Sequence, residues 1–162
     1  MLLPPDRFVH DPTFDPADGI MEVKCPVATM ERPEVAAVTK KGFCLQSGNG
    51  KVSLNREHAY YYQVMCQMSC SGRSWCDFVM CGGEIFVERI HYDSKFWADC
   101  VPKLHGFYME YLLPELACPG QCKAFLLWTM IHNLRTKFYH RFLTFCGFNI
   151  EILLPELACQ GW

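Results

Sequence analysis

The sequence predicts a globular domain that mixes β-strands with α-helices. Hydrophobic residues make up 51% of its 162 residues and charged residues 20%, a balance typical of a chain that folds around an apolar core. Short apolar runs indicate strands, longer stretches of helical periodicity indicate helices, and Gly or Pro residues separate the two. The length is sufficient for one domain of ordinary size.

The first predicted element is a hairpin. Arg7–His10 and Ile20–Cys25 form its strands, and a loop rich in Pro, Asp and Gly joins them, with Asp18-Gly19 as the turn before the second strand. This pairing would bring Asp6 beside Glu22 on the neighbouring strand. Asp6 alone has a simpler interpretation, as the solvated carboxylate of a loop.

Glu22 and Lys24 lie two residues apart in the second strand, so their side chains share one face of it. An anion and a cation at this spacing on an apolar strand fit a metal-dependent phosphodiesterase site. There the carboxylate holds a hard cation, and the ammonium acts on the attacking water or on the phosphate. The alternative is an exposed strand face with a single ion pair.

A helix, a second hairpin and a longer helix are expected next. The first helix begins at Pro33, a residue favoured in the first helical turn. The predicted bounds are Pro33–Lys41 for this helix, Phe43–Gln46 and Lys51–Leu54 for the hairpin strands, and about Arg56 to Ser71 for the second helix, with an N-cap at Asn55 and a stop at Gly72.

The second of these helices carries a polar stripe. Tyr60, Gln63 and Gln67 lie at positions i, i+3 and i+7 of one face. The two glutamines are either plain surface residues or amide groups that the helix offers to a site on the first hairpin.

Two strands and a long helix complete the predicted domain. Trp75–Cys81 is strongly apolar, whereas Glu84–Tyr92 carries charged residues on both faces, which places it near a sheet edge. Asp93 or Ser94 caps a helix that begins at about Lys95 and keeps an apolar face as far as Leu112.

The C-terminal part of the chain contains a duplication. Leu-Leu-Pro-Glu-Leu-Ala-Cys occurs at residues 112–118 and again at 153–159, and two copies are too few for a solenoid. We expect residues 1–118 to form the domain and residues 119–162 an appended helical segment. Basic and aromatic residues interleave in this segment, which fits either a helix packed weakly on the domain or one that contacts nucleic acid or membrane.

Composition limits the partners and the compartment. The net charge of −2 gives no overall basic field, so DNA contacts would need a local patch. No apolar run approaches the ~20 residues of a membrane span, so we expect no membrane partner. Eleven cysteines without a Cys-x-x-Cys pair, and no secretory segment, predict free thiols in a reducing intracellular compartment. A zinc site is the alternative.

Several of these segments together resemble one family. Pro5-Asp6 followed by Glu22-Val23-Lys24 is similar to the divided Pro-Asp and Asp/Glu-x-Lys signature of restriction-endonuclease-like nucleases. With the ordered segments Tyr60–Met68, Trp75–Val79, Val87–Asp93 and Phe96-Trp97, the chain resembles the YqaJ-like viral recombinase domain, the group that includes phage lambda exonuclease. The resemblance covers Pro5 to Ala117.

The resemblance implies an α/β fold with a restriction-endonuclease-like core, a central mixed sheet flanked by helices. It implies a DNA exonuclease of recombination or DNA metabolism, often acting on one strand of duplex DNA from its 5′ end. Asp6 and Glu22 would be ligands of Mg²⁺ or of Mn²⁺ in its place, with the Val23 carbonyl as a third ligand. Lys24 would orient the water or stabilise the charged phosphate, and Gln63 matches the family's glutamine near the site. By family analogy alone, this chain would form a homo-oligomer, specifically a trimer.

The chain departs from the family at both ends. The family's domain begins well upstream, with helices that add another acidic ligand and close the DNA channel, so we expect that part to be missing here. The segment 119–162 has no counterpart. Two functions are therefore open: a Mg²⁺-dependent DNA exonuclease, or a truncated, catalytically inactive module of the same fold that acts in binding or assembly.

Overall fold

The computed structural model describes residues 4–25, 32–39, 42–48 and 50–114. These residues divide into two compact units, one ending at Asp93 and the other beginning at Ser94. The predicted domain boundary at residues 118 and 119, the second copy of the duplicated heptad and the appended segment all lie outside the described residues.

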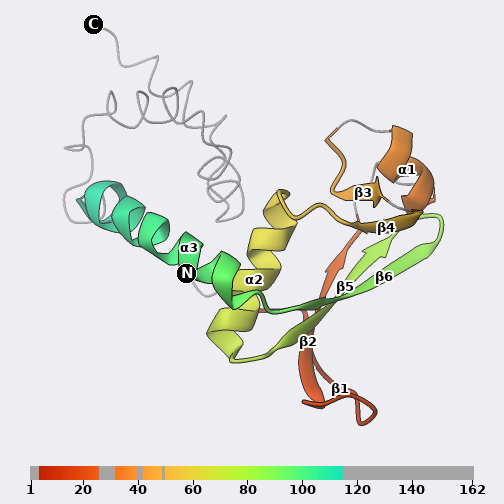
Figure 1. The fold of residues 1–162 in the computed structure, drawn as a ribbon, viewed down its shortest axis with the longest axis horizontal. Coiled ribbons are helices and arrows are strands. Elements are labelled where there is room, and N and C mark those ends of the chain that lie inside the picture. The colour runs from red at the N-terminus through yellow and green to blue at the C-terminus, as the bar shows by residue number, and fades with distance from the viewer. Residues whose placement is uncertain (1–3, 26–31, 40–41, 49, 115–162) are drawn as a thin grey trace, which may run out of the picture. The chain divides into compact units, whose positions relative to one another are not determined.

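The first unit is built on a four-stranded mixed sheet (Figure 1). The strand order is β1 (Arg7–His10), β2 (Asp18–Lys24), β5 (Trp75–Cys81) and β6 (Ile85–His91). The outer pairs are antiparallel, whereas β2 and β5 run parallel. The predicted first hairpin and the edge position of the last strand are both confirmed, and the unit is of the mixed α and β class.

A parallel pair requires a long crossover connection, and here that connection contains a hairpin and two helices. Its elements are α1 (Pro33–Thr39), β3 (Leu45–Gly48), β4 (Lys51–Leu54) and α2 (Ala59–Ser71). α2 ends at Gly72, whose φ of 66° gives the left-handed C-cap that glycine favours.

The start of α2 differs from the prediction. Asn55 does not cap the helix, because its side chain accepts a hydrogen bond from the backbone of Glu57 in a turn before the helix. The N-cap is His58, whose Nδ1 accepts a hydrogen bond from the backbone N–H of Tyr60. Either side chain can close a turn, and the sequence does not indicate which one the helix uses.

Side-chain alternation gives the sheet two distinct faces. The helix face carries Ile20, Glu22 and Lys24 of β2 with Cys76, Phe78 and Met80 of β5, and α2 lies against it. The loop face carries Gly19 of β2, Trp75 and Asp77 of β5, and Arg89 of β6, and the connection between β1 and β2 packs on it. The most buried side chains of the first unit include Ile20, Leu45, Leu54, Val64, Met65, Met68, Trp75, Phe78, Met80 and Ile90.

Gly19 lies inside β2 rather than in a turn, which corrects the sequence prediction. Trp75, on the neighbouring strand, is fully buried, and its ring lies directly over Gly19. A Cβ atom at Gly19 would come within 2.3 Å of ring atoms of Trp75. The strand therefore needs a residue without a side chain at this position.

We predict that Gly19→Ala destabilises the protein by about 1–3 kcal/mol, because the buried indole cannot move away without displacing its neighbours. Urea unfolding followed by tryptophan fluorescence measures the change. Gly48→Ala is the control: nothing lies within 4 Å of its Cβ position, so we expect a change within about 0.5 kcal/mol. Equal effects at the two positions would contradict the close approach of Trp75 to Gly19.

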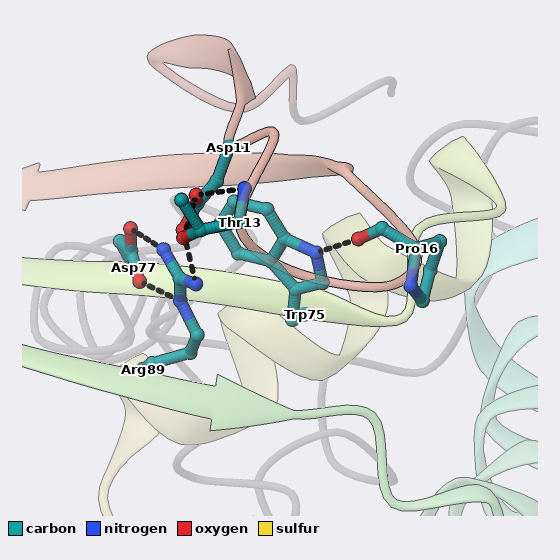
Figure 2. Close-up of polar contacts among 6 residues, drawn as sticks. All are labelled: Asp11, Thr13, Pro16, Trp75, Asp77 and Arg89. Atoms are coloured by element: carbon teal, nitrogen blue, oxygen red, sulfur yellow. Dashed lines mark hydrogen bonds and ion pairs between the residues drawn. The ribbon is translucent and has the colours of Figure 1, made fainter.

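A cluster of charged and aromatic side chains attaches the β1–β2 connection to the loop face (Figure 2). The guanidinium of Arg89 donates two hydrogen bonds of 2.8 Å to Asp77 and one of 2.7 Å to Asp11. It lies 4.0 Å from the ring centre of Trp75, whose Nε1 donates to the carbonyl of Pro16 at 2.7 Å. The hairpin that bears Asp6 and Glu22 is thus fixed to the sheet by directional contacts.

The surroundings of Asp11 in this cluster lower the pKa of its carboxyl group. The Thr13 hydroxyl donates to it at 2.6 Å, and this bond, followed by that from Arg89, lowers the pKa of Asp11 to about 2. Because the pKa of Asp11 in the folded protein lies below the ordinary value of 3.8, the resulting stabilisation of the fold is complete above pH 3.8. It is lost as the pH falls towards about 2.

We predict that Thr13→Val raises the pKa of Asp11 towards 3.8, because it removes the largest cause of the shift, whereas Thr13→Ser keeps the low value. An NMR titration of the Asp11 carboxyl carbon measures both. The wild-type protein should lose more stability than the valine variant between pH 3.8 and about 2. The same Asp11 pKa in both variants would show that the hydroxyl is not responsible.

The second unit begins with α3 (Ser94–Phe107), followed by a π-helical turn, η1 (Tyr108–Leu112). The predicted long helix is thus present, and its last turn is wound more widely than the α-helix expected from its apolar periodicity. Within the described residues, no helix is both long and apolar enough to span a membrane.

Candidate active site

Glu22 is a buried carboxylate held by three side-chain donors. It is 3% exposed, near the C-terminal end of β2 on the helix face. Its Oε1 accepts hydrogen bonds of 2.5 Å from Lys24 Nζ and from Gln63 Nε2, and its Oε2 accepts one of 2.8 Å from Gln67 Nε2. A buried charge requires such partners, since its transfer out of water is otherwise very costly.

α2 supplies both amides because Gln63 and Gln67 are one helical turn apart and therefore lie on the same side. Both side chains are buried, at 8% and 1% exposure. Of the two interpretations open from the sequence, the structure supports the amide groups of a site over plain surface residues.

Lys24 provides the positive charge beside Glu22. Its side chain is 20% exposed, and its Nζ lies 5.0 Å from the ring centre of Tyr60 in α2. The aromatic ring and the carboxylate both attract the ammonium. The pair therefore lies between β2 and α2, with the carboxylate buried and the ammonium partly exposed, and is not an ion pair on an open strand face.

Asp6 is anchored next to this group. Its Oδ2 accepts a 2.7 Å hydrogen bond from the backbone N–H of Val23, the residue after Glu22. In a strand, the N–H and C=O of one residue point to the same edge, so the Val23 carbonyl faces the edge where Asp6 lies. Asp6 is itself exposed, and the hairpin brings it to β2 across 17 residues of sequence.

Cys76 lies on the neighbouring strand β5, on the same face of the sheet as Glu22. Burial, together with the nearby negative charges of Glu22, Asp77 and, more weakly, Asp6, raises the pKa of the Cys76 thiol to about 12. A thiol in this environment is protonated at neutral pH and is not a nucleophile. The chemistry of the site therefore belongs to the oxygen and nitrogen groups around it.

The oxygen atoms of this site are of the types that bind a hard cation. Asp6 and Glu22 offer carboxylates and Val23 a carbonyl, the ligand types that Mg²⁺ and Mn²⁺ prefer. Gln67 Oε1 is buried without a hydrogen-bond partner beside them, and a buried amide oxygen needs a donor or a cation. Among the described residues, no group of three or more His, Cys, Asp or Glu side chains has the spacing of a metal site, so water would have to complete the coordination.

The structure thus brings together all the site residues predicted from the sequence: Asp6, Glu22, Val23, Lys24 and Gln63. Gln67 shares the helical stripe with Gln63, but the family resemblance implies a role only for Gln63. The signal for it was the four-residue spacing from Gln63, which keeps both amides over the same strand.

Comparisons with protein-family models, with curated proteins and with solved structures gave no match to this chain.

We predict that Gln67→Leu destabilises the protein by about 1–3 kcal/mol, because it leaves Glu22 Oε2 buried without a donor. Chemical unfolding at neutral pH measures the loss. Gln46→Leu, at an exposed position of β3, is the matched control and should change stability by no more than about 0.5 kcal/mol. A Gln67→Leu protein as stable as the control would show that the amide does not hold the carboxylate.

Proposed function

We propose that this chain is a metal-dependent DNA nuclease of the restriction-endonuclease-like fold, acting as an exonuclease in DNA recombination or DNA metabolism. The observation that supports it is the convergence of Asp6, Glu22 and Lys24 at the end of β2. Two carboxylates and one ammonium, with a backbone carbonyl at the same edge, make up the set of groups that phosphodiester hydrolysis with a hard cation requires.

Each residue has a distinct part in this proposal. Asp6, Glu22 and the Val23 carbonyl would hold the cation, Mg²⁺ or Mn²⁺, which when bound activates water and neutralises charge on the phosphate. Lys24 would orient the attacking water or stabilise the additional negative charge of the pentacovalent phosphate, for which a compact ammonium is well suited. Gln63 and Gln67 would keep the Glu22 carboxylate in place.

One observation favours a second candidate function. The two oxygens of Glu22 already accept three hydrogen bonds, and Lys24 already compensates its charge. Such a group is complete as a structural element. The alternative is therefore a catalytically inactive nuclease-fold module that acts in binding or assembly.

The first test is digestion of linear duplex DNA with 5′-phosphates, with Mg²⁺ and with EDTA. We expect loss of DNA in Mg²⁺ only. Glu22→Gln, Asp6→Asn and Lys24→Met should each lower the rate at least ~100-fold, because each removes a charged group from the reacting centre.

Glu84→Gln is the control for this series, because Glu84 is a half-exposed carboxylate whose partner is Arg32. It should digest DNA at the wild-type rate. No digestion at high protein concentration, with a rise in melting temperature on adding Mg²⁺ that Asp6→Asn abolishes, would contradict the enzyme and support the binding module. Mg²⁺-dependent digestion that persists in all three site variants would place the activity elsewhere.

A further inference from the structure

Cys25 and Cys81 lie opposite each other at the ends of two neighbouring strands. The parallel register of β2 and β5 pairs Lys24 with Met80. The next residue along each chain segment is a cysteine: Cys25 directly follows β2, and Cys81 ends β5. By alternation, both side chains point to the loop face, away from Glu22. The strand spacing of ~4.8 Å falls within the Cα separation of about 4.4–6.8 Å that a disulfide requires.

The two thiols are in contact in the folded protein. The pKa of the Cys81 thiol is raised, first because its side chain hydrogen-bonds to that of Cys25 and then by partial burial. Both are free thiols, Cys25 exposed and Cys81 half-buried. A sulfur–sulfur bond therefore needs no rearrangement of the sheet, and an oxidant in solution can reach Cys25.

Three other cysteines of the described chain, Cys44, Cys76 and Cys100, are buried. Burial raises the pKa of Cys44 and of Cys100 to about 11, and that of Cys76 to about 12. All three are buried thiols that an oxidant in water does not reach. Cys70 is exposed like Cys25, but it lies in α2, outside this pair.

We propose that Cys25 and Cys81 are a redox-active pair that a peroxide converts into an intramolecular disulfide. The sulfur of Cys25 attacks the O–O bond of hydrogen peroxide, which gives a sulfenic acid and one water. The sulfur of Cys81 then displaces the hydroxyl group of the sulfenic acid as a second water. Two thiols lose two electrons and two protons, and one peroxide is reduced to two waters.

In this proposal, Cys25 and Cys81 form a site of oxidative modification at the ends of β2 and β5. The bond would join β2 to β5 one residue beyond Lys24, and a dithiol would reverse it. In a reducing compartment, a disulfide of this kind forms transiently in response to an oxidant. The inference uses no part of the proposed nuclease activity and would hold for a binding module as well.

The test treats the purified full chain with hydrogen peroxide, blocks the remaining thiols with iodoacetamide, and maps disulfides by mass spectrometry after a non-reducing digest. We expect a peptide that links Cys25 to Cys81, lost on treatment with dithiothreitol. The linked peptide should be absent from Cys25→Ser and from Cys81→Ser and present in Cys70→Ser, the control for an exposed cysteine.

Two results would overturn the proposal. One is a wild-type product in which Cys25 carries a sulfinic acid or joins a second chain, visible as a dimer on a non-reducing gel. The other is that iodoacetamide fails to modify both thiols even before oxidation, and that EDTA, but not dithiothreitol, makes them accessible. This result would identify a metal bound by the pair. The wild-type digest alone decides between these results, so the test does not depend on the folding of a variant.

Discussion

The buried carboxylate of Glu22 is the constraint on which the rest of the first unit depends. A negative charge that is 3% exposed must be compensated within the fold. Lys24 supplies the charge from the same strand, but the two amides come from α2, 41 and 45 residues further along the chain. The crossover between the two parallel strands must therefore return α2 to the face of β2 that carries Glu22, and hydrophobic packing alone would not fix this register.

The opposite face of the sheet uses the same principle with different residues. Arg89 compensates Asp77 and Asp11 between aromatic rings, and it joins β6, β5 and the connection that follows β1. β2 lies between these two networks. Because the connection is attached to the loop face, the hairpin that begins at Asp6 has a fixed position, and Asp6 reaches the Val23 N–H on β2. The polar contacts of one face thus position a residue of the candidate site on the other.

Local patterns were enough to predict the hairpins, the edge strand and most helix bounds, because turn residues and side-chain periodicity are properties of neighbouring residues. The contact of Gly19 with Trp75, the Arg89 cluster and the second amide on Glu22 depend on strand register, which the sequence of one strand does not contain. The predicted cap, Asn55, was wrong for a related reason, since the structure uses His58 instead. Both side chains can close a turn, and the packing of α2 on β5 decides where the first helical turn lies.

Charge balance separates the two functions that these residues allow. The ammonium of Lys24 already neutralises Glu22, and one cation cannot fully compensate both a carboxylate and a phosphate diester. If the site hydrolyses DNA, a second positive charge must therefore come close to Glu22. The oxygen ligands for such a cation are the exposed carboxylate of Asp6 and the Val23 carbonyl at the same edge of β2. If the site is structural, Lys24 suffices and Asp6 only fixes the end of the hairpin. The fold is the same in both cases, and the difference lies in whether Asp6 and Glu22 share a cation.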